Sequence, residues 1–191
     1  MNKILLILIL TLSFQSWIKA EDIRDLEIEG MSIGDSLLDY FSQDEIKNSN
    51  TYKYKNDKFI GVDLRLKNTE VYELVQIHYK PSNEYIIAST VGAIFYEDIN
   101  NCYKKKDEIV KDLSKSLENF KIINDGTFQA REDKTGKSTM TAVVFELKNG
   151  EVGVTCTYFS NEFKIKNNYE NNIRVDISTK EFSDWLRNEA F

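Results

Sequence analysis

The sequence predicts an α+β domain in which an antiparallel β-sheet, made of a meander and a hairpin, has helices packed on one face. Residues 59–97 contain three strand-like segments joined by short polar turns, residues 98–120 have a long helical pattern, and Asn149-Gly150 separates two further apolar segments. Strands joined directly by short turns pair antiparallel, and helices kept apart from the strands in sequence are typical of the α+β class.

The first residues have the pattern of a secretory signal peptide. Lys3 precedes the apolar run Ile4–Phe14, and a more polar stretch ends at Ala20. The run is shorter than the about 20 residues that a membrane-spanning helix needs. We therefore expect residues 1–20 to be a signal peptide and residues 21–191 to form a single domain. The same pattern predicts a periplasmic or secreted protein with no stable membrane span after cleavage.

The charge of the chain limits its partners. The formal net charge is −6, and cleavage after Ala20 changes it to −8 because Lys3 and Lys19 are removed. Nucleic-acid binding relies on basic residues that neutralise phosphates, so this acidic chain is predicted not to bind nucleic acid. The short basic run Lys104–Lys106 is interpreted as a solvated helix face.

The residues after the signal-like segment predict a strand and two consecutive helices. "DLEIE" (25–29) is strand-like, and Ser32 with Asp35 has the spacing of a capping box. Ser42 repeats this signal, so a helix from Ser32 is expected to break and restart there. Residues 47–57 are predicted to form a surface loop. The apolar face of the first helix is formed by Ile33, Leu37, Tyr40 and Phe41.

The meander strands show alternating apolar residues. His78 alternates with polar neighbours on the second strand and is interpreted as an ordinary surface histidine. Pro81 turns the chain before the third strand. The residues predicted to face the core are Ile60, Val62, Leu64 and Leu66 in the first strand, and Val71, Val75, Ile77 and Tyr79 in the second.

The two cysteines are predicted to form a disulfide. Cys102 lies on the apolar stripe of the helix at 98–120. A type I′ turn at Asn149-Gly150 would place Cys156 on the core side of its strand. The bond would stabilise by about 4 kcal/mol in the chain-entropy account, and the alternative is two buried thiols. The predicted hairpin pairs are Leu147 with Val152, Phe145 with Val154, and Val143 with Cys156.

The end of the chain predicts one more strand and one more helix. The strand is "NNIRVDIS" (171–178), and Ser178 with Glu181 is expected to cap the helix that follows. Phe182, Trp185 and Leu186 form its packed face. Residues 123–138 are interpreted as a long polar connection.

Gly34, Asp35, Ser36 and Leu37 spell the motif of the GDSL esterases and lipases, which this stretch resembles. That family places the serine after an apolar strand of a parallel α/β fold, with a histidine in an Asp-x-x-His motif near the C-terminus. Here His78 is the single histidine, and Val75 stands three residues before it. A serine nucleophile needs a neighbouring base. Ser36 is therefore predicted to be a first-turn helix serine, and a hydrolase using Ser36 or an unidentified carboxylate pair is the alternative.

No catalytic, cofactor-binding or metal-binding residue is predicted. One histidine and two distant cysteines do not form a zinc motif, no glycine-rich loop follows a strand, and no cofactor is expected. Tyr52 and Tyr54 in "TYKYK" are residues of a kind that binding surfaces use. The preferred interpretation is a non-enzymatic protein that binds a protein or a cell-envelope component.

Several stretches resemble an uncharacterised family of small exported proteins from marine bacteria of the Pelagibacter type, to which no activity is attached. They are "IEGMSIGDSLLDYFSQDEI", "CYKKKDEIVKDLSKSL" and "VDISTKEFSDWL". The opening "IEGMSIGDSLLDYF" is also similar to the start of outer-membrane assembly lipoproteins of the BamE kind, although the lipid-bearing cysteine is missing. Neither likeness implies a catalytic activity.

Overall fold

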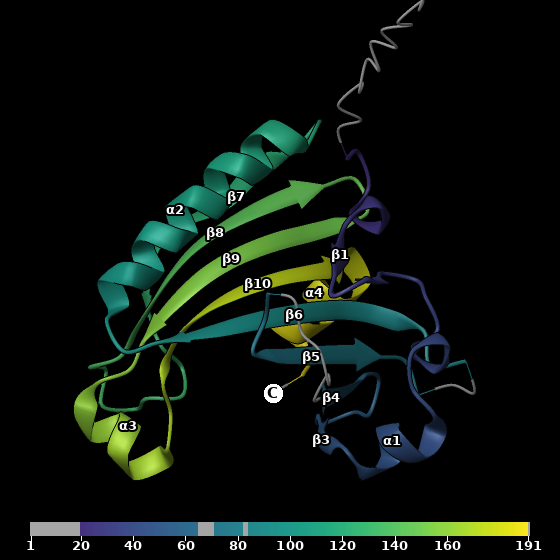
Figure 1. Cartoon of the computed structure of the whole chain (residues 1–191), viewed down its shortest axis with the longest axis horizontal. Coiled ribbons are helices and arrows are strands. Elements are labelled where there is room, and N and C mark those ends of the chain that lie inside the picture. Colours follow the sequence, from purple (N-terminus) through teal and green to yellow (C-terminus); the bar gives the residue numbers. More distant parts are fainter. Residues whose placement is uncertain (1–19, 65–70, 82–83, 191) are drawn as a thin grey trace, which may run out of the picture.

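The computed structural model describes residues 20–64, 71–81 and 84–190. It contains an antiparallel sheet of eight strands in the order β3-β4-β5-β6-β10-β9-β8-β7, together with a small sheet of β1 and β2 (Figure 1). The elements are η1 (Ile23–Asp25), β1 (Glu27–Ile28), β2 (Met31–Ser32), η2 (Leu37–Asp39), α1 (Gln43–Asn48), β3 (Asn50–Lys53), β4 (Ile60–Leu64), β5 (Leu74–Tyr79), β6 (Ile87–Tyr96), α2 (Ile99–Ser116), β7 (Lys121–Gln129), β8 (Thr139–Leu147), β9 (Gly150–Tyr158), α3 (Asn161–Asn167), β10 (Asn171–Thr179) and α4 (Lys180–Asn188).

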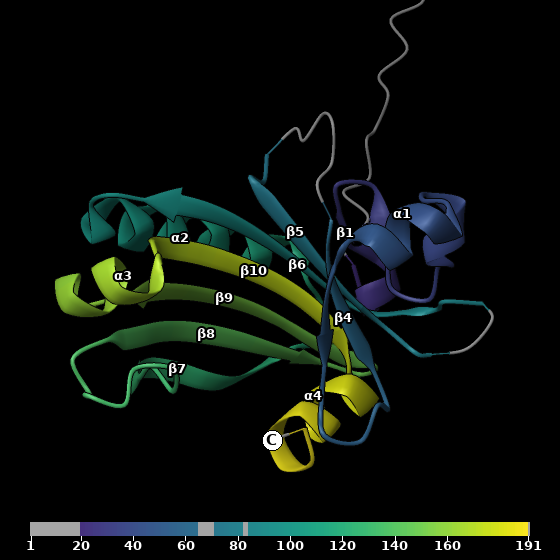
Figure 2. The same cartoon turned by 90° about the horizontal axis from the view of Figure 1, so that it is seen from below.

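The predicted α+β class with an antiparallel sheet is confirmed. The strands form two consecutive meanders, β3 to β6 and β7 to β10, which meet where β6 pairs with β10. The helices divide between the two faces of the sheet. Helix α2 packs along β9 and β10 on one face, whereas α4 packs on the other (Figure 2).

The face under α2, called here the disulfide face, is apolar. It carries the predicted bond between Cys102 and Cys156, which is confirmed, and both residues are fully buried. Val154, Ile173 and Val175 surround the bond. The prediction succeeded because α2 and β9 each place a cysteine on the apolar side that their own periodicity defines.

The opposite face, called here the open face, carries the alternate residues of the same strands. On β10 these are Arg174 and Asp176, which lie beside Thr155 and Gly153 of β9. Helix α4 covers one end of this face through Phe182 and Trp185. Figure 2 shows β7 to β10 from this side, with α2 behind them.

The helix predicted from Ser32 is wrong, because Ser32 belongs to β2 and Gly34 interrupts the stretch that follows. Glu29 and Gly30 have φ values of 50° and 76° and form the turn between β1 and β2, and Gly34 follows with φ 96°. A right-handed helix does not continue through Gly34, because its positive φ lies outside the helical region. Only the 3-10 turn η2 forms before α1. The restart at Ser42 is confirmed, because its side chain and that of Glu45 make a capping box.

The hairpin of β8 and β9 is shifted by two residues from the predicted register. Leu147 pairs with Gly150, Phe145 with Val152, and Val143 with Val154, so the turn residues are Lys148 and Asn149. A shift of two residues leaves every side chain on its predicted face, and Cys156 still reaches the core. Gly150 serves close packing instead of a turn, because an added Cβ would lie 2.1 Å from the Ser178 carbonyl oxygen.

Several edge elements were predicted as loops. Residues 47–57 contain β3, all of it exposed, and residues 123–138 contain most of β7. Helix α3 was not predicted, and α4 begins at an N-cap provided by Thr179 instead of Ser178. Within the described residues, no helix is long and apolar enough to cross a membrane.

The predicted core positions of the meander are largely confirmed. Val62, Leu64, Val75, Ile77 and Tyr79 are buried. Ile60 is half-buried, and the exception is Val71, which precedes β5 and is 61% exposed. The predicted core position 66 lies outside the described residues.

Candidate binding surfaces

The hydroxyl of Ser36 has structural partners on both sides. Ser36 is the N-cap of η2, and its Oγ accepts a hydrogen bond from the Leu38 backbone N–H at 3.3 Å. The same Oγ donates to the Glu84 carbonyl oxygen at 2.6 Å. Ser36 therefore begins a 3-10 helix, where the sequence had indicated the first turn of an α-helix, and it links η2 to the start of β6.

The interpretation of His78 as a surface residue is wrong, since its side chain is only 4% exposed. Phe182 of α4 lies over the imidazole, with ring centroids 4.6 Å apart. Nε2 shares a hydrogen bond of 2.9 Å with the Tyr54 hydroxyl, while Nδ1 has no partner among the described residues. Burial, together with the charge of Arg174, lowers the pKa of His78 to about 3. His78 is therefore neutral and is held in a small aromatic core.

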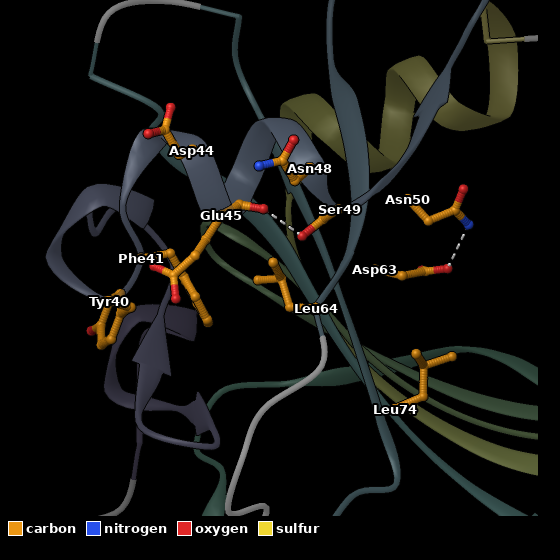
Figure 3. A pocket seen from close by; sticks show the side chains of 10 residues that line it. All are labelled: Tyr40, Phe41, Asp44, Glu45, Asn48, Ser49, Asn50, Asp63, Leu64 and Leu74. Carbon is orange, nitrogen blue, oxygen red and sulfur yellow. Dashed lines mark hydrogen bonds between the residues drawn. The ribbon is translucent and has the colours of Figure 1, made fainter.

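A hollow of about 820 Å³ lies between the η2–α1 segment and the end of β4, and Figure 3 shows the side chains that line it. Its polar groups are largely engaged with each other. Asp63 accepts hydrogen bonds from Gln76 at 2.9 Å, from Asn50 at 3.2 Å and from the Tyr52 hydroxyl. Glu45 closes the capping box of α1. The described residues contain no group of three His, Cys, Asp or Glu side chains placed to hold a metal ion.

The outer strand β7 offers a different kind of surface. It is nine residues long and forms one edge of the sheet, where it pairs only with β8. Ile122, Ile123 and Phe128 are 49%, 46% and 45% exposed. A bulge at Ile123 interrupts the register, after which Asn124 to Gln129 pair regularly with β8. The opposite edge, β3, has four residues, of which Tyr52 is an exposed large apolar side chain at 38%.

The centre of the open face contains two charged side chains, Arg174 and Asp176, on strand β10. Arg174 is exposed and Asp176 half-buried, and neither makes a hydrogen bond or an ion pair with another described residue. By contrast, Arg187 of α4 forms two hydrogen bonds with Glu151, of 2.9 and 2.6 Å. The sequence did not single out Arg174 and Asp176, because any strand with one solvated face, such as β10, has polar residues at alternate positions.

The comparisons with known proteins add no relative. No protein-family model, curated protein or solved structure matches the chain. Functional inference therefore rests on the surfaces described above.

Proposed function

We propose that this protein is an exported, non-enzymatic binding domain that holds an extended segment of another envelope or secreted protein along β7. The observation that carries the proposal is the unpaired outer edge of β7, nine residues long and bordered by three exposed large apolar side chains. An edge strand has a free row of backbone N–H and C=O groups, and a partner strand that adds to it completes the hydrogen-bond ladder.

The position of the apolar side chains supports this mode of binding. Ile122 pairs with Phe145 on the disulfide face, whereas Phe128 pairs with Met140 on the open face. A strand added beside β7 would thus meet an apolar contact on each face of the extended sheet. Because side chains alternate along a strand, the expected partner segment is extended and carries apolar residues at positions that match both contacts.

Export is the part of the proposal that rests on the sequence. The signal-like segment 1–20 supports it, and a disulfide between Cys102 and Cys156 is stable in oxidising compartments such as the periplasm. We propose a periplasmic or secreted location on this basis. Intact-mass measurement of the secreted or periplasmic protein tests it, because cleavage near Ala20 removes a defined mass.

Photo-crosslinking tests the binding mode. A photoreactive residue replaces Phe128 in cells that produce the protein, and a matched control replaces Ile165 of α3, which is 86% exposed. We expect the probe at position 128, and not the probe at position 165, to capture one partner through an extended segment. The substitution Ile122→Lys should abolish the capture, because it places a charge at the apolar contact.

Hydrogen exchange provides a second readout with the captured segment as a synthetic peptide. Binding should protect the outward amides of β7 and leave those of β3 unchanged. Capture that persists in Ile122→Lys, or a bound peptide that protects no β7 amide, would contradict strand addition.

A further inference from the structure

Arg174 and Asp176 occupy the middle of the sheet, on its open face. In the strand order, β10 lies between β6 and β9. Arg174 is flanked by Ala93 of β6 and Thr155 of β9, both of them small and buried. The guanidinium thus stands above a floor of short side chains. The side chains beside Arg174 on both neighbouring strands are therefore short, whereas Arg187 lies against Glu151.

The carboxyl group of Asp176 is packed closely against the same floor. An added Cβ on Gly153 would lie 2.3 Å from Asp176 Oδ1, so the glycine makes room for this side chain. Val91 lies on the other side. The carboxyl group nevertheless has no hydrogen-bond donor among the described residues. The half-buried Asp176 and the exposed Arg174 therefore lie two residues apart on one face, and neither forms a hydrogen bond or an ion pair with another described residue.

The open face is also enclosed on the side of β3. The charge of Arg174 acts on Tyr52 and Tyr54, although β3 is four strands away from β10 in the sheet. Burial raises the pKa of the Tyr54 hydroxyl, and Arg174 opposes this shift. The segment between β3 and β4 also reaches α4, where Trp185 Nε1–H donates a hydrogen bond to Asn56 Oδ1 at 2.9 Å.

We propose that Arg174 binds the anionic group, a carboxylate or a phosphate, of a small ligand on the open face, with the Asp176 carboxyl group as its immediate neighbour. A guanidinium presents a planar fork of N–H donors that matches both anions. Thr155 supplies a hydroxyl beside the fork. The site is separate from the β7 edge, so it does not depend on the function proposed for that edge.

Asp176 makes this binding dependent on pH. Burial and the neighbouring Glu151 raise the pKa of Asp176 to about 6, and Arg174 opposes them. Above this value the carboxylate repels a bound anion, whereas below it the protonated group can donate a hydrogen bond to the anion. The other charged and titratable residues on this face include Glu146 and Lys121, Glu151 with its partner Arg187, Lys80 with its partner Glu181, His78, Asp63, Tyr52 and Tyr54.

Titration of the full exported chain, followed by amide NMR shifts, tests the proposal. Acetate and inorganic phosphate are compared at about pH 5.5, where both carry close to one negative charge. The anion that binds more tightly shows whether the site prefers a carboxylate or a phosphate group. We expect saturable shifts at Arg174, Ala93 and Thr155 with at least one of the two. Arg174→Gln should weaken binding about tenfold or more, as loss of a charge-assisted contact does. The matched control is Arg131→Gln, an exposed arginine outside the sheet, and it should bind as the wild type does.

The pH dependence is measured with sulfate, whose charge is constant from about pH 5.5 to pH 8. Binding to the wild type should be tighter at the lower pH, and Asp176→Asn should bind equally well at both. Shifts that do not saturate, or binding that Arg174→Gln leaves unchanged, would overturn the proposal. Binding to Asp176→Asn that keeps the pH dependence of the wild type would overturn the role of Asp176.

Discussion

The two faces of the sheet are built from the same strands but differ in polarity and packing. On the disulfide face, Ile173 and Val175 of β10 pack under α2 beside the Cys102–Cys156 bond. On the open face, Arg174 and Asp176 of the same strand remain without protein partners among the described residues. A single alternating strand thus contributes apolar side chains to the core on one side and places charged side chains on the other.

This difference separates stability from recognition. Residues on the disulfide face are buried and packed around the Cys102–Cys156 bond, so substitutions there should change the free energy of unfolding. Arg174 and Asp176 on the open face are exposed and half-buried, so substitutions of these two residues should alter binding or pH behaviour more than folding. The predictions below test this separation, beginning with the largest expected effect.

Loss of the disulfide should have the largest effect. In the chain-entropy account, closing a loop over a separation of 54 residues stabilises by about 4 kcal/mol. The double variant Cys102→Ala/Cys156→Ala should lose about this much in urea unfolding. Thr157→Ala on the open face of β9 is the control and should lose less than about 1.5 kcal/mol, because it removes only one methyl and one hydroxyl group. Equal losses in the two variants would remove the distinction between the faces.

Two glycines of β9 test the comparison more finely. Gly150→Ala places a Cβ 2.1 Å from the Ser178 carbonyl oxygen, and this backbone group cannot move freely. Such overpacking should cost about 2 to 3 kcal/mol. Gly153→Ala meets only the Asp176 carboxyl group, which can rotate toward solvent, so it should cost less than about 1 kcal/mol. Thermal unfolding of both variants measures the difference, and a reversed order would contradict the assigned packing.

Asp176 should make the protein less stable as the pH rises. Its pKa is about 6 in the folded protein against 3.8 in the unfolded chain, so the folded state holds more protons between these values. Stability is therefore lost from about pH 4 to pH 6, by about 3 kcal/mol in total. Asp176→Asn should unfold at the wild-type temperature at pH 4 and at a higher temperature at pH 8. A variant that is less stable than the wild type at pH 8 would show that the carboxylate is favourably paired.

The sequence predicted the elements whose two sides differ in polarity. Helix α2 and strands β9 and β10 each have one apolar side, so Cys102 and Cys156 were placed correctly without knowledge of the register. A register shift of two residues in the hairpin did not change this result, because the side-chain period of a strand is two.

The failures occurred where tertiary contacts decide the structure. The apolar spacing of Ile33 and Leu37 is helical, yet the positive φ of Gly34 overrides it, and both side chains are buried by a different route. Strand β7 has no regular alternation because the bulge at Ile123 interrupts it. His78 lies on the more polar face of its strand, and it is buried because Phe182 of the distant helix α4 covers it.

The unpaired charges of the open face could not be predicted from the sequence. Arg174 and Asp176 alternate with apolar residues as any solvated strand residues do. Their lack of partners depends on the small neighbours that the register brings beside them, such as Ala93 and Gly153. Pairings between strands distant in the chain are not encoded in local periodicity.

The smallest expected effect is at Ser36. Its Oγ caps η2 and donates to the Glu84 carbonyl oxygen, so Ser36→Ala should cost about 1 kcal/mol, as loss of an N-cap does. The control Ser114→Ala removes an exposed hydroxyl that bonds only to its own helix, and should cost less than about 0.5 kcal/mol. Because Ser36 has a structural role, a fluorophosphonate probe should not label it. Labelling that disappears in Ser36→Ala would instead identify a nucleophile and restore the hydrolase alternative.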